Sequence, residues 1–255
     1  MEGYFKDDVQ NSLWTYYQEN GSKGHEGHYL NGKMEGEWIW WYETGEVWKI
    51  GNYKNGLRHG KWTVYFENGK VFYTGEYLHN LEEGKWTRYY QSGKTETVGF
   101  FKNGQMDGEW ITLSEKGSKM QILNYAENNY HGICQYYSET GLPQMTVTYK
   151  NGVRDGYYAD YDDFGNRIIV GSYKDGNKHG TWEYYNKVQR KMREENFDNG
   201  IITGTWKTWY PNGKLESEKT YNNGALNGMF IRYDERGNVV FKAKYNNNKL
   251  VQRYQ

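Results

Sequence analysis

Histidine and cysteine are the side chains in this sequence best suited to metal binding or acid–base catalysis. There are six histidines and one cysteine, Cys134. The segment His25-Glu26-Gly27-His28 resembles a fragment of the zinc-protease motif HExxH, but its second histidine comes one residue too early and no helix is expected there. A single cysteine forms neither an intramolecular disulfide nor a CxxC metal site. These residues therefore predict no metal centre.

An acidic segment at residues 160–165 offers oxygen ligands for calcium. An EF-hand loop needs a carboxylate or amide where Phe164 stands, and it needs a glutamate further on that is missing here. We expect an acidic hairpin tip instead. No serine has the surroundings of a nucleophile elbow, and no glycine spacing is separable from the repeat described below. We therefore predict a protein that is not an enzyme and needs no cofactor.

The overall charge and composition exclude further classes. The sequence has 32 Lys and Arg against 32 Asp and Glu, so nucleic-acid binding, which requires a basic face, is not expected. Aromatic residues make up 18% of the chain, which argues against disorder. No apolar run is long enough to cross a membrane, and the first residues lack a signal-peptide pattern. We expect a cytoplasmic protein, exported only if a signal peptide has been removed.

A repeat of 24 residues organises the whole chain and must position any site. An aromatic residue opens every unit, and the units begin at Phe5, Tyr29, Tyr53, Tyr77, Phe101, Tyr125, Tyr149, Tyr173, Phe197 and Tyr221, with a partial unit at Tyr245. The eighth position is glycine except at Ser12, and the seventeenth is glycine except at Gln189. The tenth position is tryptophan in seven repeats. Such a period indicates a repeat architecture.

Each 24-residue repeat has the pattern of two strands joined by a turn. In residues 53–76 an aromatic and β-branched stretch is followed by Glu67-Asn68-Gly69 and a second such stretch, and Asn-Gly or Asp-Gly pairs join most units. The sequence predicts an all-β, elongated, single-layer antiparallel sheet of about ten stacked hairpins, similar to a solenoid. Residues 1–4 lead in, residues 5–244 hold ten repeats, and residues 245–255 form a half repeat that caps the stack.

The tenth and thirteenth positions, both usually aromatic, are three residues apart. Strict alternation along a strand would place these rings on opposite faces of the sheet, and a bulge would bring them together. The pattern leaves both arrangements open and favours a curved sheet whose rings pack across adjacent repeats.

These columns give the chain a family resemblance. The pattern G-x-W-x-x-Y-x-x-x-G-x-x-x-x-x-G-x-Y-x-N-G resembles the MORN repeat, especially the bacterial variant found in YwqK-type antitoxin proteins, and it covers residues 5–255. The resemblance implies stacked β-hairpins. Repeats 1, 5 and 8 depart from it at Ser12, Leu113 and Gln189, and the tip of repeat 8 thereby loses its turn glycine.

Aromatic residues outside the repeated columns are the first candidates for a binding patch. Trp40 shares the twelfth column with Tyr16, and Trp48 shares the twentieth with Phe72. Clusters of exposed rings mark interaction surfaces, whereas a second aromatic layer of the core is the alternative. We predict a candidate binding patch of Tyr16, Trp40, Trp48 and Phe72.

A second candidate is basic and lies in repeat 8. Lys187, Arg190, Lys191 and Arg193 cluster there, followed directly by two glutamates. Such a cluster is either a solvated hairpin or a docking site for an acidic partner or a lipid headgroup, and the two glutamates disfavour the lipid.

The sequence favours a non-catalytic, protein-binding repeat scaffold. The family resemblance implies a narrower form, an antitoxin whose partner protein is a toxin. The alternatives are a module that associates with membrane phospholipid, which zero net charge disfavours, and a carbohydrate-binding repeat protein. Because an open sheet ends in edge strands, we expect a monomer or a weak end-to-end dimer.

Overall fold

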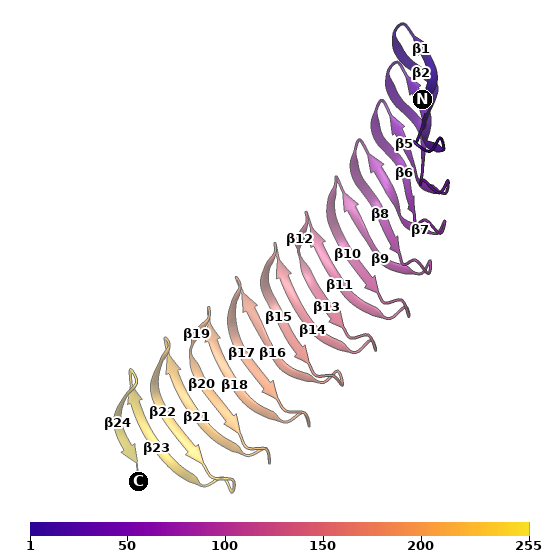
Figure 1. The fold of residues 1–255 in the computed structure, drawn as a ribbon. Coiled ribbons are helices and arrows are strands. Elements are labelled where there is room, and N and C mark those ends of the chain that lie inside the picture. The colour runs from indigo at the N-terminus through magenta and orange to yellow at the C-terminus, as the bar shows by residue number, and fades with distance from the viewer. Residues whose placement is uncertain (255) are drawn as a thin grey trace. The chain divides into compact units, whose positions relative to one another are not determined.

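The computed structural model describes residues 1–254, and their regular structure consists of β-strands. No helix in this part of the chain is long and apolar enough to cross a membrane. The chain forms two compact units, Met1–Asn129 and Tyr130–Gln255, which we describe separately. In each unit antiparallel hairpins follow one another in an open sheet (Figure 1). The predicted all-β repeat fold is thus confirmed.

Unit 1 is the indigo-to-magenta part of Figure 1. Its strands are β1 (Glu2–Lys6), β2 (Val9–Tyr17), β3 (Lys23–Leu30), β4 (Lys33–Trp41), β5 (Val47–Lys54), β6 (Leu57–Tyr65), β7 (Val71–Leu78), β8 (Leu81–Tyr89), β9 (Thr95–Lys102), β10 (Gln105–Leu113) and β11 (Lys119–Ala126). A two-residue strand, β12 (Asn129–Tyr130), lies at the division between the units.

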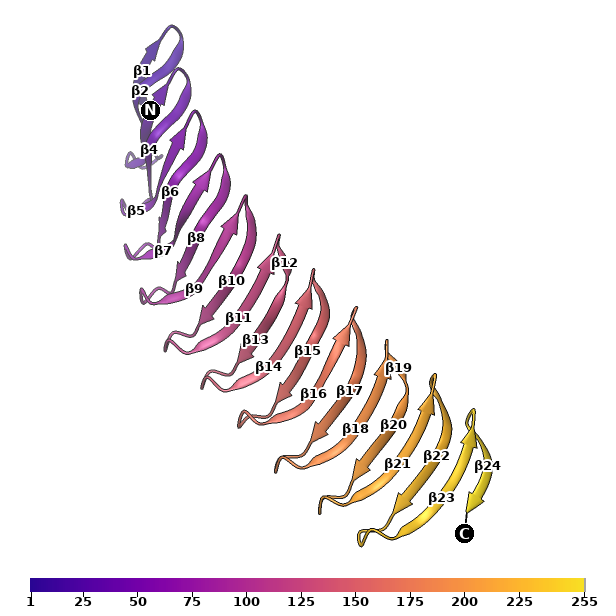
Figure 2. The ribbon, with the colours of Figure 1, turned by 180° about the vertical axis from the view of Figure 1, so that it is seen from behind.

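Unit 2 is the pink-to-yellow part of the chain, seen from behind in Figure 2. Its strands are β13 (Gly132–Tyr137), β14 (Pro143–Lys150), β15 (Val153–Tyr161), β16 (Arg167–Lys174), β17 (Asn177–Tyr185), β18 (Lys191–Asp198), β19 (Ile201–Ile202), β20 (Gly204–Trp209), β21 (Leu215–Asn222), β22 (Ala225–Tyr233), β23 (Val239–Asn246) and β24 (Lys249–Tyr254).

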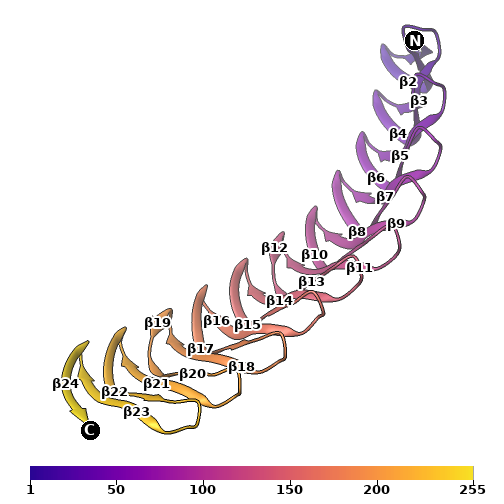
Figure 3. The same ribbon diagram turned by 60° about the horizontal axis from the view of Figure 1, so that its bottom comes forward.

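Two kinds of turn alternate along the chain. A two-residue turn, Asn55-Gly56, joins β5 to β6, and both residues have positive φ (54° and 81°), as a type I′ hairpin turn requires. A longer turn joins β6 to β7, where the Phe66 N–H donates to the Lys70 carbonyl (2.8 Å) and Gly69 has φ 76°. The long turns lie along one edge of each unit and the short turns along the other (Figure 3). The repeated Asn-Gly and glycine signals therefore set the hairpin register.

Rings occupy both faces of the sheet. In β17 the Tyr185 hydroxyl donates to Glu183 (2.8 Å), so the thirteenth position shares a face with the eleventh. Trp182 and Tyr184, at the tenth and twelfth positions, lie on the other face, where Lys178 contacts both rings. A bulge does occur between positions twelve and thirteen, but it does not bring the two ring columns together. We call the face that carries the tenth position the tryptophan face.

The tryptophan column packs on a column of glycines. A Cβ placed on Gly27 would lie 2.1 Å from Cδ2 of Trp38, and one on Gly171 would lie 2.3 Å from Cδ2 of Trp182. An indole that faces glycine therefore rests flat against the backbone of the preceding strand, where a Cβ would collide with the ring. Its N–H also finds an acceptor there, since Nε1 of Trp38 donates to the His28 carbonyl at 3.1 Å. Trp38 is fully buried as a result.

Where the tenth position is not tryptophan, the residue that faces it on the preceding strand is not glycine either. Tyr158 lies opposite Val147, which is fully buried, and Phe230 lies opposite Lys219. Trp206 breaks the pairing of tryptophan with glycine, because the residue that faces it is Glu195. Its ring plane makes 57° with that of Phe197, whereas the matching angles for the six other tryptophans of this column lie between 72° and 88°. The indole has turned to make room for a side chain.

Repeat 8 keeps its hairpin tip although it lacks the turn glycine. Gln189 takes the left-handed conformation (φ 58°), and its N–H donates to the Asn186 carbonyl at 2.9 Å, as Gly69 does in repeat 3. Ser12 likewise adopts φ 62° at the position of the missing glycine in repeat 1. The backbone geometry is thus conserved at a conformational cost of about 1 kcal/mol for a residue with a Cβ.

Gln189→Gly should therefore stabilise unit 2. Relief of the left-handed strain outweighs the larger entropy of glycine in the unfolded chain, so we expect a gain of about 0.5–1 kcal/mol. Thermal unfolding followed by circular dichroism measures it. The reverse change, Gly213→Gln at φ 88° in the next repeat, serves as the control and should lower the midpoint. A lower midpoint for Gln189→Gly would contradict this account of the turn.

Candidate functional site

Tyr16 and Trp40, two members of the predicted patch, belong to the tryptophan face. Trp40 packs beside Trp62 with ring centroids 5.6 Å apart, and Tyr16 stacks on His25 at 4.2 Å. The register places His25 between Tyr16 and Trp40. These two rings are half-buried members of the aromatic layer rather than an isolated pair.

Trp48 and Phe72, the other two members, lie at the bulges beside the long turns. Trp48 packs against Tyr42 (6.2 Å) and is 40% exposed, and Phe72 packs against Phe66 (4.7 Å). Both rings line one cleft of about 470 Å³ on unit 1. The structure therefore brings Trp48 and Phe72 to one concave surface.

The four basic residues of repeat 8 do not form one patch. Lys191 pairs with Glu183 and with Glu194 (2.9 Å), on the face opposite the tryptophans. Arg193 lies on the tryptophan face, with its guanidinium 4.0 Å from the centre of the Tyr184 ring and Nε 3.0 Å from Glu195. Arg190 donates to the Pro211 carbonyl at 2.7 Å. Lys187 lies in the exposed turn between β17 and β18. The cluster is thus divided between two faces and partly neutralised.

Two clefts adjoin each other on unit 1, and we define them by their central residues. The Lys49 cleft (about 470 Å³) is lined by Tyr42, Trp48, Lys49, Arg58, Trp62, Val64, Tyr65, Phe66, Phe72, Tyr73 and Tyr77. The Trp86 cleft (about 450 Å³) is lined by Phe72, Tyr73, Tyr77, Glu82, Trp86, Thr87, Arg88, Thr97, Phe101 and Trp110. Phe72, Tyr73 and Tyr77, all on β7, belong to both clefts. Together they form a continuous concave surface, which we call the unit-1 groove.

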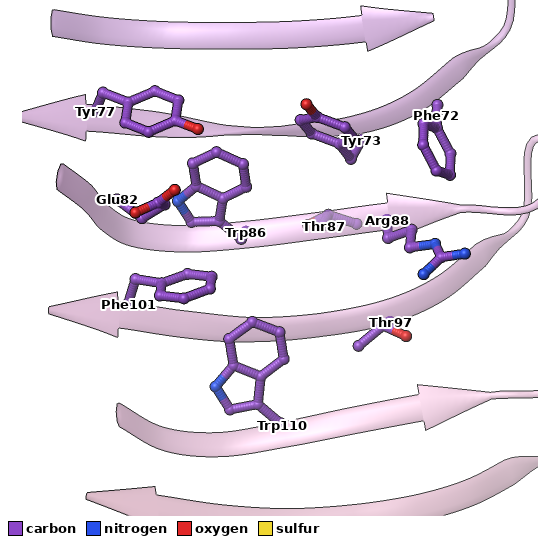
Figure 4. A pocket seen from close by; sticks show the side chains of 10 residues that line it. All are labelled: Phe72, Tyr73, Tyr77, Glu82, Trp86, Thr87, Arg88, Thr97, Phe101 and Trp110. Carbon is purple, nitrogen blue, oxygen red and sulfur yellow. The ribbon is translucent and has the colours of Figure 1, made fainter. Parts of the chain in front are cut away.

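Arg88 and Thr97 line the Trp86 cleft on neighbouring strands (Figure 4). Position twelve holds Arg88, whose Nε lies 2.9 Å from Glu96 and whose guanidinium lies over Phe72 (5.2 Å). Position twenty-one holds only Thr97. The small side chain of Thr97 therefore leaves open space between Arg88 and Trp110. The indole N–H of Trp86 is buried and has no acceptor within residues 1–254, unlike that of Trp62, which donates to the Asn52 carbonyl.

The Lys49 cleft has a cationic wall. Nζ of Lys49 lies 4.5 Å from the ring centre of Trp40 and 4.2 Å from that of Trp48, distances typical of cation–π contacts. The guanidinium of Arg58 lies 4.0 Å from the ring centre of Tyr77. Burial, and then the charge of Arg58, hold the pKa of Lys49 below its usual value. The cleft thus combines aromatic surface with two positive charges.

Tyrosine hydroxyls in the groove (Tyr73 and Tyr77) and beside it (Tyr53) are hard to ionise. Burial raises the pKa of Tyr77 to about 12, and it also raises the pKa values of Tyr53 and Tyr73. In each case the nearby Arg58 acts in the opposite direction without cancelling the effect. These side chains therefore remain neutral donors at physiological pH.

Stability should fall steeply in alkali. The folded-state pKa of Tyr77 is raised above the unfolded value of about 10. Its contribution to the free energy of unfolding is therefore complete below about pH 10 and is lost as the pH rises toward about 12. Unfolding midpoints between about pH 9 and about pH 11, together with absorbance at about 295 nm, test this. Tyr77→Phe should make the decline shallower. A midpoint that does not change over this range would contradict the prediction.

Sequence reasoning missed most of the groove. Lys49, Arg58, Trp86 and Arg88 are not among the residues predicted from rings outside the repeated columns. The available signal was positional, since the sixth, twelfth and twenty-first columns share the tryptophan face. A charge or a small residue in those columns marks a place where the aromatic layer is interrupted.

The comparisons with known proteins identify the repeat. A family model described as "MORN repeat variant" matches five segments of the chain, residues 34–55, 58–79, 82–103, 130–151 and 202–223. Three of the five lie in unit 1 and contain every lining residue of the two clefts except Trp110. No curated protein matches the chain.

Solved structures show only distant likeness. The crystal structure of TcdB2-TccC3-Cdc42 aligns at 10% identity with a TM-score of 0.23, covering 96% of this chain but 16% of the other. A porin-like protein from Bacteroides uniformis aligns at 11% identity with a TM-score of 0.19, covering 95% and 92% of the two chains. The chain thus spans about one sixth of the length of the first structure it matches. These TM-scores are too low to support a shared fold.

Proposed function

The chain is a MORN-repeat protein with repeats of the variant type, and from the surface of unit 1 we propose that it is a non-catalytic scaffold that binds a partner protein in the unit-1 groove. The observation that carries this proposal is the meeting of two clefts at Phe72, Tyr73 and Tyr77. Half-buried aromatic rings with nearby charges are the residues that contribute most to protein interfaces.

The scaffold would present this groove in a fixed shape. Phe72, Tyr73 and Tyr77 lie on β7, which pairs along its length with β6 and β8. Side chains held on a paired strand lose little conformational entropy when a partner binds. No group of three His, Cys, Asp or Glu side chains within residues 1–254 could hold a metal ion. Binding rather than catalysis is the activity that this arrangement of rings and charges supports.

Capture from a lysate of the source cell, followed by reconstitution with the purified partner, tests the proposal. Trp48→Ala/Phe72→Ala removes two rings that line the Lys49 cleft without touching the fully buried Trp38. We expect the double variant to bind the purified partner at least about tenfold more weakly than the wild type. Phe164→Ala, which removes a 78% exposed ring in unit 2, is the matched control and should bind normally.

Equal affinity of the wild type and the double variant for the partner would show that the partner does not bind in the unit-1 groove. Binding of the wild type to anionic vesicles alone, with no protein recovered, would contradict a protein partner. The antitoxin form adds a further expectation, that the recovered partner is toxic when produced alone and harmless when produced together with this chain.

A further inference from the structure

Lys49 and Arg58 are cations without a carboxylate partner. Neither forms an ion pair with any carboxylate within residues 1–254, and no residue that lines the Lys49 cleft is acidic. Lys49 Nζ and the Arg58 guanidinium each lie 5.9 Å from the Trp62 ring centre. One donor of Arg58 is used, on the Asn80 carbonyl (3.1 Å), which leaves its other N–H groups available. Two like charges therefore share one aromatic floor.

Repeat 8 shows how this face neutralises a cation from within. Arg193 occupies the same twenty-first position as Lys49, and Glu195 occupies the twenty-third. The Glu195 carboxylate, buried to 5% exposure, lies 3.0 Å from Arg193 Nε and accepts from the Tyr184 hydroxyl at 2.9 Å. A carboxylate in this place thus fits between a cation and an aromatic ring of the tryptophan face.

Repeat 2 has no such carboxylate. Its twenty-third position is Gly51, and a Cβ there would lie 2.3 Å from Cε2 of Trp62. The indole of Trp62 fills the space over Gly51, so repeat 2 has no acidic side chain at the place where repeat 8 has Glu195. Within residues 1–254 no carboxylate pairs with Lys49 or Arg58, so the place is open to a carboxylate from another molecule.

We propose that Lys49 and Arg58 form a carboxylate-binding site for an acidic side chain of a partner polypeptide. This inference rests on the proposed function and names the chemistry of the partner. The carboxylate lies between Lys49 Nζ and the free N–H groups of Arg58, above Trp62. An apolar side chain nearby in the same peptide occupies the adjoining Trp86 cleft.

The surroundings favour a peptide over a lipid headgroup or a free phosphate. Aromatic rings surround the two cations, and a carboxylate on an apolar stem suits such walls better than a heavily hydrated phosphate. The Trp86 cleft begins at the residues shared with the Lys49 cleft, and its volume of about 450 Å³ accommodates a large side chain. A charged residue next to an apolar one in an extended segment matches the two clefts.

Selection of displayed random nonapeptides on the full chain tests the site. We expect the recovered peptides to share an Asp or Glu next to an apolar residue. Each would be synthesised with its acid intact and with that acid changed to its amide, and its dissociation constant measured by fluorescence polarisation. The amide form should bind at least about tenfold more weakly, because a charge-assisted interaction is lost.

Variants of the chain locate the effect. Lys49→Met and Arg58→Met keep the aliphatic stems over the rings and remove the charges, and each should weaken the acidic peptide at least about tenfold while leaving the amide peptide nearly unaffected. Lys61→Met, an exposed lysine on β6, is the control and should leave both peptides unchanged. Thermal midpoints confirm that each variant is folded.

Several results would overturn the site. These are recovery of no peptide, recovery of peptides without an acidic residue, or equal binding by wild type and Lys49→Met. Binding of inorganic phosphate or phosphatidylserine vesicles that depends on Lys49, without any peptide, would also overturn it. If a captured partner depends on Trp48 and Phe72 but not on Lys49 or Arg58, this inference fails and the proposed function stands. If no partner reconstitutes, the proposed function itself fails.

Discussion

Replacing Gly27 with alanine should destabilise unit 1 by about 3 kcal/mol or more. The added Cβ would lie 2.1 Å from Cδ2 and 2.4 Å from Cε2 of Trp38, far inside van der Waals contact. Trp38 is fully buried and its N–H is bonded to the His28 carbonyl, so the ring has no free position to move into. When the overpacked ring cannot move aside, the loss in the free energy of unfolding lies at the upper end of the usual range for such substitutions.

The control for Gly27→Ala lies in the same strand. Gly24→Ala places its Cβ 3.2 Å from Cγ of the flexible Gln18 side chain, so we expect a loss below about 1 kcal/mol. Urea unfolding of both variants, followed by tryptophan emission, separates them. The double variant Gly27→Ala/Trp38→Phe should lose less than the two single changes added together, because the smaller ring relieves the clash. Equal midpoints for Gly27→Ala and Gly24→Ala would contradict the packing of indole on glycine.

The second large effect is expected in unit 2. Trp182→Ala should cost about 3–5 kcal/mol, because the side chain is only 2% exposed and packs against both Tyr158 (5.4 Å) and Tyr173 (5.0 Å). Its indole N–H also bonds the Ser172 carbonyl at 3.1 Å. Loss of the ring therefore leaves a cavity and an unpaired carbonyl.

Trp206→Ala is the comparison for Trp182→Ala. Trp206 lies only half-buried beside Glu195, with its ring tilted, so its removal should cost clearly less. Thermal and urea unfolding measure both variants. A Trp206→Ala variant as unstable as Trp182→Ala would show that the glycine beneath the ring contributes little to the packing of this column.

The fold was largely predictable because a period of 24 residues repeats the same local signals. Asn-Gly pairs specify the short turns and glycines specify the long ones, so register follows from sequence alone. The faces of the tenth and thirteenth columns were not predictable, since a bulge lies between them and its effect on side-chain direction depends on three-dimensional packing. The retained tip at Gln189 was also hidden, because the neighbouring hairpins impose a conformation that its own sequence disfavours.

The candidate site was predictable only in part. Trp48 and Phe72 stood out as rings beyond the columns, and the structure places both in the Lys49 cleft. Lys49 and Arg58 gave no signal as single residues, because their meaning depends on the missing carboxylate at Gly51 and on the face they share. The YwqK-type resemblance, and the antitoxin role it implies, stay predictions.

The most direct test of the central claim is calorimetry with the purified partner. The wild type, Trp48→Ala/Phe72→Ala and Phe164→Ala would be titrated under the same conditions. We expect saturable binding by the wild type and by Phe164→Ala, and at least about tenfold weaker binding by the groove variant. Equal dissociation constants for all three proteins would show that the unit-1 groove is not the binding surface.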